Sequence, residues 1–347
     1  MTSAKFLKEA LLYQKLPGKK VRCNVCQRRC LIAEGKWGYC QTRVNQKGLL
    51  YTTIYGVVSS VNLDPIEKKP VFHFKPGSNC LSLGTYGCNF RCKFCQNWQI
   101  AYTNVASLNL DGQKLLSPQE AIKMALKSNA QGIAITYNEP AIWLEYSLDV
   151  FKLAKKENLY TVWVTNGYAT KETIDLIAPY LDVYRVDLKS FDDRFYQKLI
   201  NVPQAKPIFA TTKYLHQQYP QIHIECVTNI IPSWNDKPQN LTSIAKWIKE
   251  NLGPKTPWHV TRFYPDAELN NVPPTPPATL FKAREIGLKQ GLKFVYIGNM
   301  PVEKENDTYC PKCGNLAIRR TGYLTEILGV DKEGHCPDCG EDLNLKI

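Results

Sequence analysis

Three cysteines in the middle of the chain have the spacing of an iron–sulfur site. Cys88, Cys92 and Cys95 are separated by three and by two residues. Three thiolates on one loop can hold three corners of a 4Fe–4S cubane, whereas an electron-transfer cluster of this kind takes four cysteines. The triad would leave one iron open, and an open metal position is where chemistry can occur. A zinc knuckle is the alternative, but zinc sites favour paired Cys-x-x-Cys units that supply four ligands.

Two further groups of four cysteines flank the triad, in a chain with 13 cysteines in all. Disulfides are rare in reducing compartments, so grouped thiols in a chain without a secretory signal indicate metal binding. The spacing of the N-terminal group favours zinc, with a second iron–sulfur cluster as the alternative. The C-terminal group has the spacing of a zinc ribbon or, alternatively, of a rubredoxin-like iron site. The two groups are Cys23, Cys26, Cys30 and Cys40, and Cys310, Cys313, Cys336 and Cys339. Cys80 and Cys226 stand alone and are predicted to be buried apolar side chains.

Strands and helices alternate through the region that contains the triad. Strands are predicted at 81–85, 132–136, 160–165, 183–188, 222–231, 258–263 and 294–297. Helices are predicted from a capping box at Ser117 and Glu120, and at 142–156, 171–178, 208–216, 241–251 and 278–289. The alternation predicts the α/β class, with a parallel sheet closed into a partial or complete β/α barrel. An open doubly wound sheet is the alternative. The triad follows the first strand, and barrel enzymes carry their chemistry on the loops after the strands.

The composition is that of a globular enzyme with small appendages. The chain has 347 residues, of which 44% are hydrophobic and 22% charged. We expect an N-terminal Cys-rich segment at 1–79, the barrel at 80–305 and a zinc-ribbon or rubredoxin-like module at 306–347. No apolar run is long enough to span a membrane, and the N-terminus lacks a secretory apolar core, so the sequence predicts a cytoplasmic location.

The loop of the triad resembles the cluster motif of the radical S-adenosylmethionine (SAM) superfamily, CxxxCxxC with an aromatic residue before the last cysteine, where Phe94 lies. A resemblance to the branch of pyruvate formate-lyase activating enzymes covers most of 80–300. Segments 64–70, 73–78 and 95–97 also resemble the AmmeMemoRadiSam-system radical SAM proteins. The superfamily resemblance implies that SAM is cleaved at a 4Fe–4S cluster to a 5′-deoxyadenosyl radical. The activating-enzyme branch implies hydrogen abstraction from a protein or peptide.

The same resemblance suggests residues that contact SAM at the ends of the second and third strands. Asn138 and Glu139 occupy the place of a Gly-Gly-Glu-Pro-like turn, although both glycines are absent. Thr165 and Asn166 match an Asp-Thr-Asn-Gly segment of the activating enzymes, while Val164 departs from it. The alternative for Glu139 is a cap on the N-terminus of the following helix, where a carboxylate is favourable.

Charged residues at the ends of the fourth and sixth strands complete the predicted SAM site. Period-two alternation points Asp187 and Lys189 to the same side, where they could meet a zwitterionic ligand. The alternative is an internal ion pair at the barrel mouth. Arg262 could clamp a carboxylate and His259 lies on the same strand. A solvated rim arginine and a packed histidine are the alternative for these two residues.

The net charge of +13 suggests an acidic electron donor, a flavodoxin or a ferredoxin, with the basic surface of an ordinary globular enzyme as the alternative. The family resemblance adds Memo-like and Ammecr-like proteins as partners. Two other functions stay open: a radical SAM enzyme that acts on a small molecule, and a zinc-ribbon protein that binds nucleic acid. The basic residues are spread along the chain rather than grouped, which disfavours nucleic-acid binding.

Overall fold

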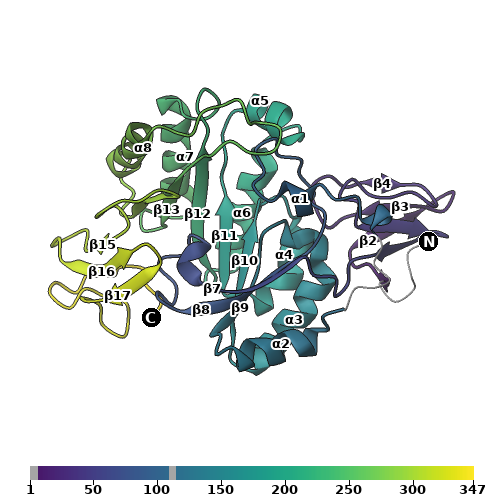
Figure 1. Cartoon of the computed structure of the whole chain (residues 1–347), viewed down its shortest axis with the longest axis horizontal. Coiled ribbons are helices and arrows are strands. Elements are labelled where there is room, and N and C mark those ends of the chain that lie inside the picture. The colour runs from purple at the N-terminus through teal and green to yellow at the C-terminus, as the bar shows by residue number, and fades with distance from the viewer. Residues whose placement is uncertain (1–6, 109–114) are drawn as a thin grey trace.

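A mostly parallel sheet forms the centre of the structure, a computed structural model that describes residues 7–108 and 115–347 (Figure 1). Its strands are β7 (Ser60–Pro65), β8 (Asn79–Gly84), β9 (Gly132–Ile135), β10 (Tyr160–Thr165), β11 (Val183–Asp187), β12 (His223–Ile230), β13 (Trp258–Arg262) and β14 (Val295–Gly298). Strands β8 to β14 pair in parallel in chain order, and β7 pairs antiparallel with β8. Within the described residues β7 and β14 do not pair, so the predicted α/β barrel is present in its partial form.

Helices make the crossovers between these strands. The long ones are α2 (Pro118–Lys127), α3 (Leu144–Lys156), α4 (Lys171–Ile177), α6 (Lys206–Gln218), α7 (Pro238–Asn251) and α8 (Pro277–Lys289). Shorter turns are α1 (Trp98–Ala101), α5 (Asp193–Phe195), Ile66–Lys68, Val105–Ser107, Pro140–Trp143, Ala178–Tyr180 and Tyr196–Ile200. The predicted capping box is present, because the Ser117 hydroxyl accepts from Glu120 N and the Glu120 carboxylate accepts from Ser117 N. Helices α6 and α7 begin earlier than predicted, since a proline fits the first turn of a helix.

Strands β9 and β10 are buried at every residue, as parallel strands covered on both faces usually are. The largest fully buried side chains of the core include Trp143, Trp163 and Trp258. This packed sheet gives the loops at its carboxyl edge a rigid support.

Two small antiparallel sheets form the N-terminal part of the chain, at one end of the molecule (Figure 1). They contain β1 (Lys8–Glu9), β5 (Arg43–Gln46) and β6 (Leu49–Thr52), and β2 (Tyr13–Leu16), β3 (Lys20–Cys23) and β4 (Leu31–Ile32). A buried ion pair at 2.8 Å between Arg43 and Glu145 fastens β5 to α3. The division into 1–79, 80–305 and 306–347 stays a prediction, although β7 joins the central sheet from within the first of these segments.

The C-terminal strands β15 (Thr308–Tyr309), β16 (Leu316–Thr321) and β17 (Leu324–Ile327) lie at the other end of the molecule (Figure 1). Arg320 on β16 donates from Nη2 to the Phe72 carbonyl at 2.7 Å, and Lys346 N donates to the His73 carbonyl at 2.8 Å. These contacts fix the C-terminal strands to the chain that leads into β8. None of the described helices has the length and apolar character needed to cross a membrane.

Candidate active site

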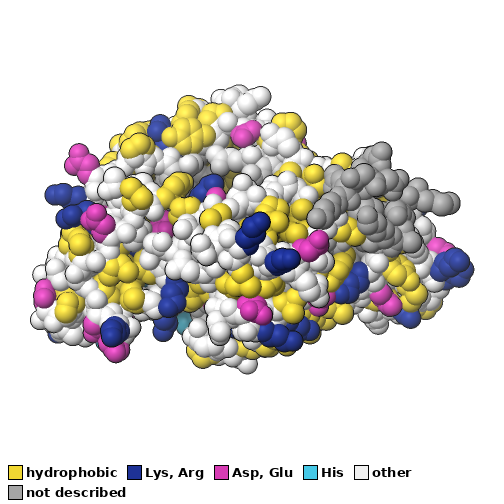
Figure 2. Space-filling view, turned by 60° about the horizontal axis from the view of Figure 1, so that its bottom comes forward, with side chains coloured by type: hydrophobic (Ala, Val, Ile, Leu, Met, Phe, Trp, Pro, Cys, Tyr) yellow, Lys and Arg dark blue, Asp and Glu magenta, His cyan; other side chains and the backbone are white. Residues whose placement is uncertain are grey.

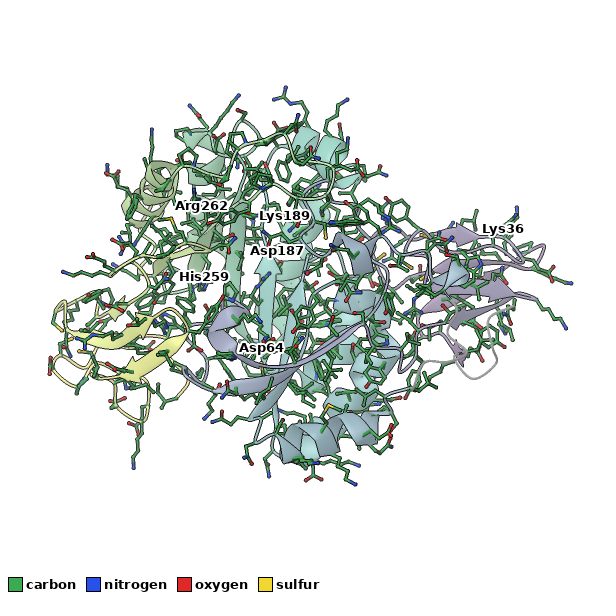
Figure 3. The ribbon with its side chains drawn as sticks, in the orientation of Figure 1. Lys36, Asp64, Asp187, Lys189, His259 and Arg262 are labelled. Atoms are coloured by element: carbon green, nitrogen blue, oxygen red, sulfur yellow. The ribbon has the colours of Figure 1, made fainter. Side chains whose placement is uncertain are left out.

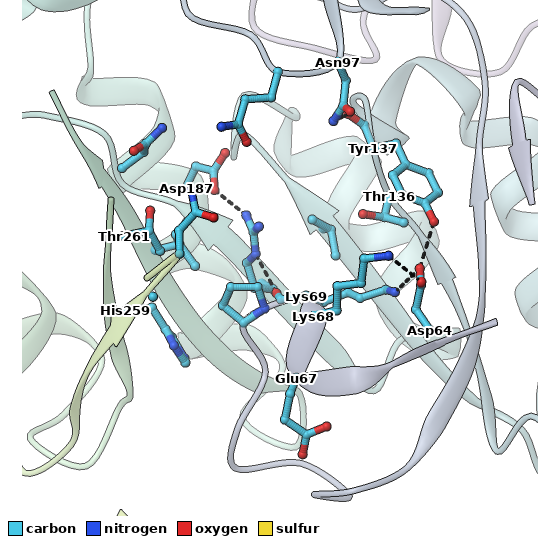
Figure 4. A pocket seen from close by; sticks show the side chains of 18 of the residues that line it. Asp64, Glu67, Lys68, Lys69, Asn97, Thr136, Tyr137, Asp187, His259 and Thr261 are labelled. Carbon is cyan, nitrogen blue, oxygen red and sulfur yellow. Dashed lines mark hydrogen bonds and ion pairs between the residues drawn. The ribbon is translucent and has the colours of Figure 1, made fainter. Parts of the chain in front are cut away.

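A cavity of about 1200 Å³ opens at the carboxyl edge of the central sheet. It brings together the triad and all but one of the SAM contacts that the sequence predicts. Figure 3 shows where Asp187, Lys189 and His259 lie in the fold, and Figure 4 shows part of the cavity wall with Asp187 and His259. Those lining residues are Cys88, Cys92, Phe94, Cys95, Asn138, Glu139, Thr165, Asn166, Asp187, Lys189 and His259. The exception is Arg262, which donates to the Thr275 carbonyl at 2.8 Å and to the Tyr264 hydroxyl at 3.2 Å and does not line the cavity. Its place agrees with the alternative of a rim arginine.

The loop that carries the triad is held by hydrogen bonds to its own backbone and to the residues after α5. Lys93 N donates to the Leu199 carbonyl at 2.8 Å, and Cys95 N donates to the Cys92 carbonyl at 2.8 Å. Arg91 Nη1 donates to the Cys88 carbonyl at 2.9 Å. These bonds hold the backbone of the loop from which the three thiols project.

The chemistry of the triad fits an iron–sulfur cluster. Cys88 is buried, and burial raises the pKa of its thiol to about 12, so a thiolate there needs a bound cation. In the described part of the chain, the sulfurs of the triad do not form a group that lies within 4.8 Å, as ligands of a single ion would. Wider spacing suits a cubane, in which each thiolate binds a different iron.

Glu139 ties the ends of β9 and β10 together. Its carboxylate accepts from Ala141 N at 3.0 Å, from the Thr165 hydroxyl at 2.8 Å and from Asn166 N at 2.8 Å. Burial raises the pKa of Glu139 to about 7. The capping alternative is thus present in the structure, and the same carboxylate also lines the cavity.

The missing glycines before Glu139 are replaced by a tyrosine with a glycine-like backbone. Tyr137 has a φ of +73°, a backbone conformation that residues other than glycine rarely adopt. Its hydroxyl donates to Asp64 at 2.8 Å and accepts from Asn62 Nδ2 at 3.0 Å, and these bonds hold the strained turn (Figure 4). Asn138 then donates from Nδ2 to the Gly87 carbonyl at 2.7 Å, which joins the turn to the triad loop.

Asp187 and Lys189 form an ion pair inside the cavity, at 2.6 Å. The period-two prediction of a common side is therefore correct, and the internal ion pair that was the alternative for these two residues is present. Burial alone would raise the pKa of Asp187, but Lys189 and Arg185 outweigh burial and hold this pKa below its usual range. The Lys189 ammonium lies 5.8 Å from the ring centre of Phe94, so a positive charge faces the triad loop.

His259 is hydrogen-bonded to a carboxylate that the sequence analysis missed. Its Nε2 donates to Glu225 at 2.6 Å, and Glu225 also accepts from His223 at 3.0 Å and from the backbone of Phe72 and His73. These hydrogen bonds overcome burial and hold the pKa of Glu225 well below its usual range. The pairing of β12 with β13 brings these side chains together, and no local spacing could have indicated it.

A second charged cluster comes from β7 and the turn that follows it. Asp64 accepts from Lys68 at 2.8 Å and from Lys69 at 2.7 Å, and Lys69 is buried (Figure 4). From the sequence, segment 64–70 was noted only for its resemblance to the AmmeMemoRadiSam-system proteins, and no charged cluster was predicted there. Arg320 on β16 and Tyr323 in the turn between β16 and β17 also line the cavity, and no sequence signal indicated them.

The C-terminal cysteines have the geometry of a site for a single metal ion. Cys310 and Cys339 have their sulfurs 3.5 Å apart, and Cys313 and Cys336 have theirs 3.6 Å apart. All four sulfurs lie within 4.8 Å of one another. Tetrahedral coordination by four thiolates is the arrangement of structural zinc, and an iron ion can take it as well.

We expect the Cys336→Ser variant to lose about one metal ion per chain and to melt at a lower temperature, because metal binding at a small module contributes to its folding free energy. The absorbance of the triad's cluster should persist. Metal analysis and thermal unfolding of anaerobic protein measure both effects. Cys226→Ser, at a buried cysteine outside the three groups, is the control that should keep its metal. Unchanged metal content and melting in Cys336→Ser would contradict a structural metal.

Comparison with known proteins agrees with the class that this fold and site define, the radical SAM enzymes. The model of the Radical SAM superfamily matches residues 82–241. A protein of uncharacterised function from Methanocaldococcus jannaschii is 39% identical over 98% of this chain and 100% of its own length. Pyruvate formate-lyase 1-activating enzyme of Escherichia coli is 24% identical over 47% of this chain and 66% of that enzyme.

Among solved structures, a radical SAM methyltransferase from Sphaerobacter thermophilus has a TM-score of 0.51 at 14% identity, over 84% of this chain and 77% of that one. This likeness concerns the fold alone. The chain belongs to the radical SAM superfamily. Within it, the chain is homologous to pyruvate formate-lyase activating enzyme and to a putative glycyl-radical enzyme activating enzyme of M. jannaschii.

Proposed function

We propose that this enzyme holds a 4Fe–4S cluster on Cys88, Cys92 and Cys95, binds SAM beside it, and abstracts hydrogen from a protein or peptide. The observation that carries the proposal is that these three thiols share one cavity with the charged residues at the ends of β9 to β11. When bound and reduced, the cluster supplies the electron that cleaves SAM to methionine and a 5′-deoxyadenosyl radical.

The residues of the chain would bind and orient SAM. Its amino-acid end carries an ammonium and a carboxylate, and the cavity offers groups of both signs at Glu139, Asp187 and Lys189. The hydrogen bonds that Glu139 accepts from three donors and the Asp187–Lys189 pair hold these groups in place before SAM arrives. Such preorganisation lowers the cost of binding. Phe94 is buried in the cavity wall and packs against Phe195, which gives the wall an apolar surface next to the triad.

A small-molecule substrate is the second candidate. The charged residues of the cavity that are not predicted to contact SAM favour it. Lys69, Arg185 and Arg320 line the cavity together with Asp64 and Glu67, from several segments, and a cavity of about 1200 Å³ is near the size of small-ligand sites. Transfer of deuterium from a labelled candidate substrate to 5′-deoxyadenosine tests both ideas. Label from a partner protein, with a protein-based radical in the electron paramagnetic resonance (EPR) spectrum, supports the activating-enzyme function, whereas label from a metabolite alone supports the second candidate.

We expect reduction of the cluster by a flavodoxin or ferredoxin to slow as salt rises, because screening shortens the field to about 10 Å at 0.1 M salt. Figure 2 shows Lys and Arg side chains spread over one face among acidic and apolar ones, so steering depends on charges close to the loop. Arg91 is committed to backbone carbonyls, whereas Lys93 is exposed.

The Lys93→Glu variant should therefore be reduced more slowly by the protein donor at low salt. The exposed Lys123→Glu, on α2, is the matched charge control and should behave like the native chain. Stopped-flow absorbance measures the rate. A rate that is independent of salt in the native chain would remove electrostatic steering from the proposal.

Contacts with Memo-like and Ammecr-like proteins and a cytoplasmic location stay predictions from the sequence.

A further inference from the structure

The N-terminal cysteines surround a small internal cavity of their own, separate from the active site. All four members of the group, Cys23, Cys26, Cys30 and Cys40, line it. The rest of its wall includes Arg28, Arg43, Asn89 and the apolar side chains Val25, Ile32 and Ile142. Four thiols around one enclosed space form a ligand set, and the sequence analysis left zinc and an iron–sulfur cluster as its occupants.

The spacing of the sulfurs separates these two occupants. Tetrahedral zinc, with Zn–S bonds of about 2.3 Å, draws its four sulfurs to about 3.8 Å from one another. Among the residues that the structure describes, the C-terminal quartet is that compact, and the N-terminal quartet is not. In this respect the N-terminal quartet resembles the catalytic triad. Wide spacing is what a cluster requires, because its thiolates bind different irons.

An unpaired donor on the cavity wall is a second, independent observation. The Asn89 side chain is completely buried, and its Nδ2 has no hydrogen-bond partner. Its Oδ1 is occupied, since it accepts from Asn166 Nδ2 at 2.7 Å. A buried N–H group without an acceptor costs free energy. Sulfide or thiolate sulfur in the cavity would accept this hydrogen bond, as N–H groups commonly donate to the sulfurs of iron–sulfur clusters.

Two arginines lie in the cavity wall, and one of them leaves its positive charge unpaired. Arg43 is buried there with its ion-pair partner Glu145. Arg28 lies over the ring of Tyr39, with its guanidinium carbon 3.4 Å from the ring centre, and its Nε donates to the Asn89 carbonyl at 2.5 Å. Within the described residues Arg28 forms no ion pair with a carboxylate. Its charge is therefore available to an anionic cluster.

The small cavity lies directly behind the triad loop. Asn89 lines it, while the preceding residue, Cys88, lines the active site. The Cys40 carbonyl oxygen would lie only 2.7 Å from a Cβ at Gly87, so this position, with φ of +84°, allows only glycine. The backbone of the N-terminal quartet therefore packs directly against the start of the triad loop.

From these observations we infer that Cys23, Cys26, Cys30 and Cys40 hold a second iron–sulfur cluster, which passes electrons to the cluster on the triad. An external one-electron donor, a reduced flavin or iron–sulfur protein, reduces the second cluster by one electron. That electron moves to the catalytic cluster and returns the second cluster to its oxidised state, with no proton or bond involved. The relay role rests on the proposed function, whereas the presence of the cluster does not.

The first test removes the catalytic cluster. A full-length variant with Cys88, Cys92 and Cys95 all replaced by Ala is reconstituted anaerobically with iron and sulfide. It should retain labile sulfide and matching iron, about two or four of each per chain, and give an EPR signal after reduction with dithionite. Adding Cys30→Ser should remove the sulfide, whereas adding Cys336→Ser should not. Zinc in place of iron and sulfide, or iron without sulfide, would overturn the second cluster.

The second test measures the relay in the otherwise native chain carrying Cys30→Ser. Reduction of the catalytic cluster by a reduced flavodoxin should slow at least about tenfold, while reduction by dithionite, a small reductant that reaches the site directly, should change less than about twofold. SAM binding should be retained. Equal rates with the protein donor would overturn the relay, even if the first test finds the cluster. A native chain that keeps the second cluster but never cleaves SAM would instead contradict the proposed function.

Discussion

The Cys92→Ala variant, reconstituted anaerobically and reduced with dithionite, is expected to release no 5′-deoxyadenosine from SAM above background. Cys92 is one of three thiols that line the active-site cavity, and a cubane with only two protein ligands is poorly held. Loss of the cluster removes the electron source, so the effect should be complete rather than partial. Chromatography of the quenched reaction measures the product.

The control for this experiment is Cys226→Ala, which removes a fully buried thiol from β12, away from the cavity. It should release 5′-deoxyadenosine at a rate close to that of the native chain. Release by Cys92→Ala at the native rate would remove the triad from the mechanism. Loss of activity in both variants would point to general instability instead.

Breaking the ion pair between β5 and α3 is expected to have the largest effect on stability. Arg43 and Glu145 have side chains exposed by only 2% and 1%, and two hydrogen bonds of 2.8 Å join them. The Arg43→Met variant leaves the carboxylate buried without its counter-charge, which costs about 3–5 kcal/mol of unfolding free energy. The midpoint of urea unfolding, followed by fluorescence, measures this loss.

A second substitution shows whether the lost stability comes from the unpaired charge. In the double variant Arg43→Met, Glu145→Leu no charge is left buried, so part of the stability should return. Leu11 N, which donates to Glu145 at 2.8 Å, then loses its acceptor, so recovery should be incomplete. Lys246→Met breaks an exposed pair with Glu250 and should cost less than about 1 kcal/mol. Equal losses in the buried and exposed variants would contradict this account.

The residues of the predicted SAM site show which groups the strand pattern alone can bring to one cavity, while their contact with SAM stays a prediction. Asn138, Thr165 and Asp187 were placed at the ends of parallel strands, and such ends meet at one edge of a sheet. Arg262 was placed by the same reasoning but lies outside the cavity. Its side chain is held by the Thr275 carbonyl, which comes from a loop whose path the strand pattern does not specify.

The sequence by itself determined the triad loop, the order of strands and helices, and the three groups of cysteines. These features depend on spacing along the chain, on apolar periodicity and on capping residues such as Ser117, all of which act over a few residues. Only the tertiary structure decided which distant groups share a site. Glu225 reaches His259 through the register of β12 and β13, and Arg320 reaches the cavity by the packing of the C-terminal strands. It also decided that the N-terminal sulfurs are spread and the C-terminal ones compact, because the folded backbone of each segment sets the distances between its thiols.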